Sequence, residues 1–179
     1  MPVIQGLGWT FDTVADTYAK LRPGYVAALY QDIFAYCPLD ASSHAVEVGI
    51  GGGQATRPVL ETGCTVTAVE PGEAYAKYYH AYYRSVPKLE DEYTEAQAIR
   101  RAEIAAKYGF IDIQHRLYRR TRVFTAAEYV QLLGTYSDHI AIEESIRKTF
   151  FAKIREAILR HGGTITIYDT IDLQLARKP

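Results

Sequence analysis

The chain has 179 residues, a length that favours one domain with a substantial hydrophobic core. Its 20 Lys and Arg residues nearly balance its 21 Asp and Glu residues, so no net field draws the protein to nucleic acid or to an anionic membrane surface. With 48% hydrophobic and 23% charged residues, the composition is that of a globular protein and excludes a disordered chain.

The N-terminal residues carry no basic segment followed by an apolar stretch, so we expect no secretory signal peptide. No apolar run approaches the about 20 residues that a membrane-spanning helix needs. Cys37 and Cys64 are isolated in the sequence and are predicted to be two buried, reduced thiols. The five histidines show no metal-ligand spacing. We therefore expect a cytoplasmic protein without a metal site.

The first half of the chain predicts alternating helices and strands. Pro23-Gly24 is a turn signal that ends any helix begun in residues 10–22. The elements that follow are indicated by apolar periodicity and by β-branched composition. They are a helix over residues 25–36, a strand over 44–49, a helix over 54–62 and a strand over 64–70.

The second half begins with helical sequence. Five of the 15 tyrosines recur at helical spacing between residues 75 and 83, which indicates an aromatic face packed on the core or, alternatively, an aromatic wall facing a substrate. Cap residues and periodicity then define the remaining elements. They are a helix over 94–108, a strand over 110–124, a helix from Thr125 to Leu133, a helix over 141–160 and a terminal strand over 164–173.

Glycines concentrate where the first predicted strand ends, in Glu47-Val-Gly49-Ile-Gly51-Gly-Gly53. Glycine lets backbone approach a ligand closely and adopts positive φ, and the N-terminus of a following helix favours the anionic end of a ligand. A dinucleotide fingerprint does not fit, because Gln54 or Thr56 stands where the third glycine belongs. A P-loop does not fit either, because the turn lacks the final Gly-Lys-Ser/Thr.

The segment resembles the Glu/Asp-x-Gly-x-Gly-x-Gly motif of class I S-adenosylmethionine-dependent methyltransferases, which Glu47, Gly49, Gly51 and Gly53 match. The resemblance implies an α/β, Rossmann-like sheet, S-adenosyl-L-methionine as cofactor and methyl transfer. It also implies that the acidic residue ending the second strand, Glu70, holds the ribose hydroxyls, and a carboxylate can accept hydrogen bonds from both.

The N-terminal segment, residues 11–25, is similar to the first helix of the small-molecule branch of these methyltransferases. In that branch a tyrosine and an arginine lie over the cofactor, so the resemblance gives this role to Tyr18 and Arg22. The alternative is a core tyrosine and an arginine at a helix end. The resemblance further implies a small-molecule acceptor.

The chain is short for this fold, because no strand is predicted between Pro71 and Gly109. The resemblance covers residues 10–74 and about 75–179, with a central block absent near Ala74–Tyr75. Three explanations are open. The chain has a true internal deletion, or the sequence omits a central segment while the numbering runs on, or the resemblance at one end is misleading. We expect one domain made of a helical cap (1–40), a cofactor-binding half (41–74) and a helical and C-terminal strand part (75–179).

The expected fold is therefore a Rossmann-like sheet reduced in strand number, with extra helices. Lost central strands leave an open sheet edge, and such edges pair readily with another chain. We expect a homodimer on this ground.

Acceptor-side candidates lie in Thr135-Tyr-Ser-Asp-His139. Consecutive residues project in different directions and cannot form a Ser-His-Asp relay, so polar capping of the following helix is the simpler interpretation. Tyr136 and His139 are nevertheless candidate catalytic residues, because the region resembles the family's substrate side. A basic cluster indicates a solvated strand edge or, alternatively, a site for a carboxylate-bearing acceptor; its members are Arg116, Arg119, Arg120 and Arg122.

Two functional hypotheses follow. The first is S-adenosyl-L-methionine-dependent methyl transfer to a small molecule. The second is a non-catalytic, methyltransferase-like remnant that acts as a dimerising or nucleoside-binding module. A nicotinamide enzyme ranks below both because the glycine spacing does not fit.

Overall fold

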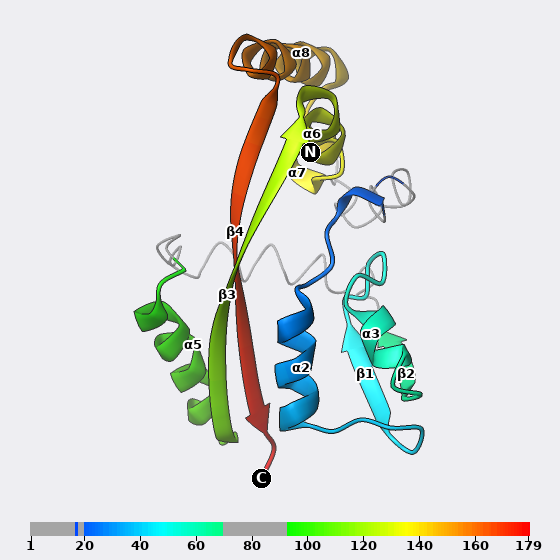
Figure 1. Ribbon diagram of the computed structural model, residues 1–179, viewed down its shortest axis with the longest axis vertical. Coiled ribbons are helices and arrows are strands. Elements are labelled where there is room, and N and C mark those ends of the chain that lie inside the picture. Colours follow the sequence, from blue (N-terminus) through cyan, green and yellow to red (C-terminus); the bar gives the residue numbers. More distant parts are fainter. Residues whose placement is uncertain (1–16, 18–19, 70–92) are drawn as a thin grey trace, which may run out of the picture.

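A computed structural model of the protein describes residues 17, 20–69 and 93–179. In this part the chain is a mixed α/β structure in which helices surround two separate two-stranded sheets (Figure 1). Tyr18, Glu70, the predicted tyrosine-rich helix and the Ala74–Tyr75 junction lie outside the described residues.

The first sheet is a βαβ unit. Strands β1 (His44–Val48) and β2 (Thr65–Val69) are parallel, with His44 opposite Thr65 and Val48 opposite Val69. Helix α3 (Thr56–Leu60) connects them and is shorter than the predicted helix, because residues 51–55 form turns. Both strands fall where their β-branched residues predict them.

The second sheet is a long antiparallel hairpin. Strands β3 (Ile111–Thr125) and β4 (Thr164–Arg177) pair from Thr125 opposite Thr164 to Ile111 opposite Arg177. Strand β4 continues past the predicted end of the terminal strand, because its final residues still pair with β3. The two sheets share no strand pairing among the described residues.

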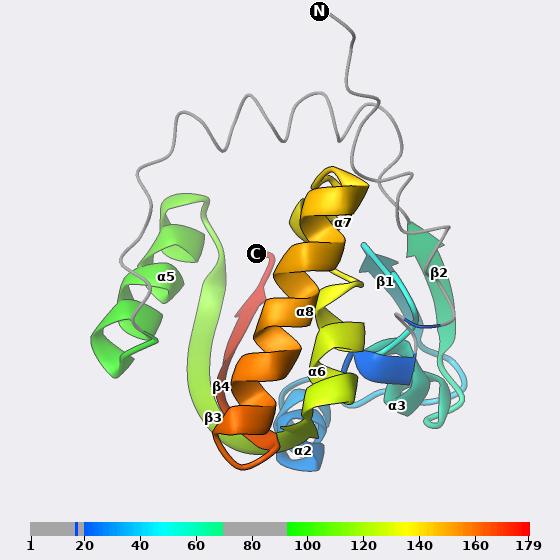
Figure 2. The same cartoon turned by 90° about the horizontal axis from the view of Figure 1, so that it is seen from above.

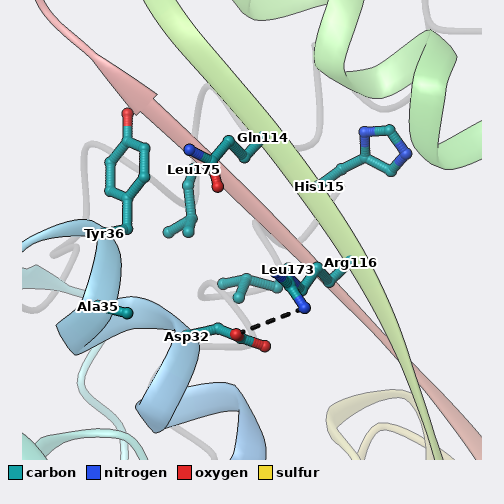
Figure 3. Close-up of a pocket in the computed structure, with 8 residues that line it drawn as sticks. All are labelled: Asp32, Ala35, Tyr36, Gln114, His115, Arg116, Leu173 and Leu175. Atoms are coloured by element: carbon teal, nitrogen blue, oxygen red, sulfur yellow. Dashed lines mark ion pairs between the residues drawn. The ribbon is translucent and has the colours of Figure 1, made fainter.

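Helices cover both faces of the hairpin. Helix α5 (Glu95–Lys107) lies on one face, where Arg101 pairs with Asp172 of β4 at 2.9 Å. Helix α2 (Ala27–Tyr36) lies on the other face, and Figures 1 and 2 both show it between the two sheets. Figure 3 shows Leu173 and Leu175 of β4 beside this helix, around a cavity of about 150 Å³.

Helix α2 is hydrogen-bonded to the turn before α3 and to the hairpin. The buried Tyr30 hydroxyl donates to the Ala55 carbonyl at 3.3 Å, next to α3. On the hairpin side, the Tyr118 hydroxyl donates to Asp32 at 2.5 Å, and Arg116 pairs with the same carboxylate at 3.5 Å. This helix therefore fixes the glycine-rich turn relative to the hairpin.

Three helices close one end of the hairpin: α6 (Ala126–Leu133), α7 (Ser137–Ile140) and α8 (Glu144–Arg160). Figure 2 shows α6 and α8 side by side. The predicted cap of α6 is confirmed, because Thr125 and Glu128 form a reciprocal capping box. The predicted capping of the last long helix by the 135–139 segment is wrong.

The cap of α8 is Glu143, whose carboxylate accepts from the backbone N–H groups of Ser145 and Ile146. Thr135 instead donates to the Leu132 carbonyl at 2.7 Å and so terminates the preceding helix.

Cys64 is buried as predicted, whereas Cys37 follows α2 and is exposed, which corrects the expectation of two buried thiols. No helix within the described ranges is long and apolar enough to span a membrane.

Strand β1 has an open edge, since among the described strands it pairs with β2 alone. Val46 and Val48 are 64% and 70% exposed, although parallel strands are normally covered on both faces. A cavity of about 600 Å³ lies between β1, α2 and β4.

Candidate functional site

The glycine-rich turn after β1 has the backbone conformation that requires glycine. Gly49, Gly51 and Gly53 have φ values of 75°, 52° and 73°, in a region that costs an L-residue roughly 1–2 kcal/mol. The Gly49 N–H donates to the Val69 carbonyl at 2.7 Å, so the turn is tied to the end of β2. The turn predicted from the glycine spacing is therefore present.

Open space lies above this turn. A Cβ added at Gly49 would meet no atom within 4 Å, whereas one added at Gly53 would lie 3.5 Å from Thr56 Oγ1. Backbone groups at the turn are therefore accessible to a ligand. The following helix adds little dipole, because α3 has only 5 residues, which corrects the expectation that its N-terminus favours the anionic end of a ligand.

Glu47 is half-buried on β1 and lines the 600 Å³ cavity together with Tyr25 and Tyr30. Burial is the main cause that raises the pKa of Tyr30, and the charges of Tyr25 and Glu47 add to it. Glu47 of the motif therefore borders a cavity whose lining also includes two tyrosines.

Two buried polar groups sit at the turn without partners. Gln54 Nε2 and Thr56 Oγ1 are shielded from solvent and make no hydrogen bond within the described part of the protein. Buried donors are rarely left unsatisfied unless a ligand or water completes them. In the sequence these two residues only argued against a dinucleotide fingerprint, and their burial without partners was not predicted.

Residues 22–24 connect the glycine-rich turn to the C-terminal part of the chain. A Cβ at Gly24 would lie 3.5 Å from the Gln54 carbonyl, and the Gly24 carbonyl accepts a hydrogen bond from Arg120 Nη1 at 2.5 Å. The guanidinium of Arg22 lies over the Tyr136 ring, 4.0 Å from its centroid. A predicted cofactor residue thus contacts a predicted catalytic residue.

His139 is packed among aromatic rings. Its ring centroid lies 5.7 Å from that of Tyr136 and 5.9 Å from those of Phe150 and Phe151. Its Nδ1 lies 3.0 Å from the Leu133 carbonyl, which can only accept, so Nδ1 carries a proton and Nε2 is the acceptor nitrogen of the neutral ring. This geometry fixes the ring beside Tyr136.

Arg120 and Arg122 of β3 share Asp169 of β4. Arg122 binds it with two nitrogens, Nε to Oδ2 at 2.6 Å and Nη2 to Oδ1 at 3.0 Å, and Arg120 Nε lies 3.0 Å from Oδ2. The hydrogen bond from Arg122 is the main cause that lowers the pKa of Asp169, and the one from Arg120 adds to it. The hydrogen bond to Asp169 is the main cause that raises the pKa of Arg122. The two arginines are therefore not the solvated strand edge that alternation indicates.

The other two arginines of the basic cluster are more exposed. Arg116 pairs with Asp32, and Arg119 donates to Thr170 Oγ1 on the paired strand. Burial, followed by the hydrogen bond to Asp32, raises the pKa of Tyr118 to about 12. The group around Asp32 attaches α2 to the hairpin (Figure 3), which is a structural role.

Comparison with known proteins gives one informative similarity. No family model matches the chain. Over 73 residues it is 37% identical to an uncharacterized methyltransferase of Geobacillus sp. strain WCH70. The similarity is to a methyltransferase. The match covers 37% of this chain and 34% of the relative, so the chain spans about a third of the length of the curated relative it matches.

Proposed function

We propose that the protein is a class I, Rossmann-like methyltransferase of reduced strand number that uses S-adenosyl-L-methionine and acts on a small molecule. The observation that carries the proposal is the glycine-rich turn, whose three positive-φ glycines lie between Glu47 and the unsatisfied Gln54 and Thr56. The similarity to a methyltransferase supports it.

The residues at the turn suit the chemistry of this cofactor. A carboxylate such as Glu47 accepts hydrogen bonds from hydroxyl or ammonium groups, and Gln54 Nε2 and Thr56 Oγ1 offer buried donors to a carboxylate or ribose oxygen. As in the methyltransferases that the chain resembles, Tyr18, Arg22 and Glu70 would also hold the cofactor. When bound, the sulfonium supplies an electrophilic methyl group.

The protein's own residues would orient the acceptor and exclude water, since alignment of the two reactants carries much of the rate gain in such a transfer. Tyr136, whose ring lies under the Arg22 guanidinium, would take part in this orientation. His139 Nε2 is the acceptor nitrogen of a fixed ring and would take a proton where the acceptor must lose one.

Calorimetry with three ligands tests the proposal on the whole chain. We expect S-adenosylmethionine and S-adenosylhomocysteine to bind, and NAD not to bind. Gly51→Val should abolish binding, because a β-branched residue does not tolerate a φ of 52°. Absence of binding by the wild-type chain would favour the non-catalytic remnant, and preferential NAD binding would favour the nicotinamide enzyme.

A further inference from the structure

The cavity of about 600 Å³ between α2, β1 and β4 is lined mainly by apolar side chains. Its volume falls within the roughly 300–1,000 Å³ that small-molecule sites usually occupy. Helix α2 contributes Leu29 and Ile33 to the lining, β4 contributes Ile171 and Leu173, and β2 contributes Val66. Such a lining favours a ligand with an aliphatic or aromatic body, because removing apolar surface from water drives the binding.

The charged side chains in this lining are acidic. The described residues place two carboxylates there, Glu47 and Asp172, and no Lys, Arg or His. Asp172 pairs with Arg101 at 2.9 Å and also accepts a hydrogen bond from Gln174 Nε2 at 2.6 Å, so its charge is compensated. Glu47 is half-buried and takes part in no ion pair of the described residues. It is therefore the carboxylate that a cationic ligand would neutralise.

The cavity reaches the glycine-rich turn. Val48, which directly precedes the turn, and Ala55, which directly follows Gln54, both belong to the lining. The Tyr30 hydroxyl, from α2, donates to the Ala55 carbonyl at 3.3 Å and so holds this end of the turn beside the cavity. Tyr25 also belongs to the lining. A molecule in the cavity therefore lies next to the turn that would hold the cofactor.

We infer that this cavity binds the methyl acceptor and that the acceptor is an apolar amine. This inference rests on the proposed function and adds a substrate class to it. The apolar body would fill the space between α2, β2 and β4, and the ammonium group would pair with Glu47, whose two oxygens have lone pairs enough for the cofactor as well. An anionic acceptor is disfavoured, because its charge would meet Glu47 and, among the described lining residues, no cation.

Three ligands with one apolar skeleton test the charge preference without the cofactor: 3-phenylpropylamine, 3-phenylpropanol and 3-phenylpropanoate. In calorimetry on the whole chain we expect the amine to bind most tightly and the alcohol to bind about tenfold more weakly, because a hydrogen bond to an ionised group is stronger than one between a carboxylate and a neutral hydroxyl. The carboxylate should bind most weakly. Equal affinities for the amine and the carboxylate would overturn the inference.

Glu47→Gln removes the charge with little change in shape and should bind the amine and the alcohol equally. Glu103→Gln, at an exposed position of α5 away from the cavity, is the matched control and should keep the wild-type preference for the amine. Retention of that preference by Glu47→Gln refutes the inference.

A second variant decides the comparison where melting curves show that Glu47→Gln fails to fold. Val48 lines the cavity and is 70% exposed, so Val48→Lys adds a cation to the lining without burying it. We expect this variant to lose the preference for the amine over the carboxylate. Val123→Lys, at a position on β3 that is 62% exposed and outside the lining, should keep it. A preference unchanged in Val48→Lys refutes the inference.

The ammonium group of the cofactor's amino-acid part is the other source of the same chemistry, and saturating S-adenosylhomocysteine distinguishes the two. Retained binding of 3-phenylpropylamine in its presence supports the assignment of the cavity to the acceptor. Loss of amine binding assigns Glu47 to the cofactor and overturns the inference. If the wild type binds S-adenosylhomocysteine but does not prefer the amine, the inference alone fails. If it prefers the amine but does not bind S-adenosylhomocysteine, the proposed function fails and the charge preference of the cavity stands.

Discussion

The Arg22 guanidinium stacks on the Tyr136 ring, 4.0 Å from its centroid, and so joins the N-terminal segment to the helices that follow β3. An arginine over an aromatic ring contributes roughly 0.5–2 kcal/mol, depending on how far the pair is desolvated. The contact places a residue expected over the cofactor against one expected at the acceptor.

Tyr136→Leu should therefore weaken cofactor binding, because the aromatic face that orients Arg22 is lost. From about 0.5–2 kcal/mol of cation–π energy we expect a fall in S-adenosylhomocysteine affinity of roughly 2- to 30-fold. Tyr136→Phe keeps the face and should bind nearly as the wild type does. Calorimetry on both variants checks this, and equal affinities for the Leu and Phe variants would remove the role given to the stack.

His139→Ala should lower both stability and turnover. The substitution removes three ring contacts and the hydrogen bond to the Leu133 carbonyl, so we expect a loss of roughly 1–3 kcal/mol in the free energy of unfolding. Denaturant unfolding measures the first effect, and methyl transfer at a temperature where the variant is folded measures the second. Turnover equal to that of the wild type would exclude His139 from the reaction.

Tyr118 should make the protein less stable at alkaline pH. Its pKa is raised to about 12 in the folded protein, whereas an unperturbed tyrosine titrates near about 10. The protonated form is thus retained longer in the folded state, so the stabilisation is complete below about pH 10 and is lost as pH rises toward 12. Urea unfolding of the wild type and of Tyr118→Phe between pH 8 and 11 checks this. If the free energy of unfolding changes with pH to the same extent in both proteins, this prediction is contradicted.

The open edge of β1 should cause self-association. Val46 is 64% exposed on β1, one edge of which pairs with no other described strand, and an apolar edge of this kind pairs readily with another chain. We expect a dimer in size-exclusion chromatography with light scattering, and Val46→Lys should shift it to monomer. Val123→Lys, at a position on β3 with 62% exposure, is the matched control. A monomeric wild type would contradict the expected dimer.

Much of the secondary structure could be predicted because its signals are local. Thr94 and Thr125 cap the helices that their sequence context predicts, and the β-branched run from Thr65 falls on β2. The cap of α8 was assigned to the wrong residues because Glu143 accepts from its first free N–H groups, and glutamate is not among the residues usually found at this position.

The arrangement in space could not be predicted, because it depends on partners distant in the sequence. Nothing local indicates that Arg122 turns inward onto Asp169 while Arg119 remains at the surface. The local sequence also does not indicate that β1 and β2 form a sheet separate from the hairpin among the described residues. The glycine-rich turn was predictable, since positive φ at three spaced positions requires glycine.

The most direct measurement is S-adenosylhomocysteine binding by Gly49→Ala and Gly109→Ala. Both glycines have positive φ, 75° and 82°, and an added Cβ meets nothing within 4 Å at either position, so the backbone strain of the two variants matches. Gly49 belongs to the turn after β1, and Gly109 follows α5. We predict that Gly49→Ala loses most of the affinity and that Gly109→Ala binds as the wild type does. Equal affinities of the two variants would contradict a cofactor site at the glycine-rich turn.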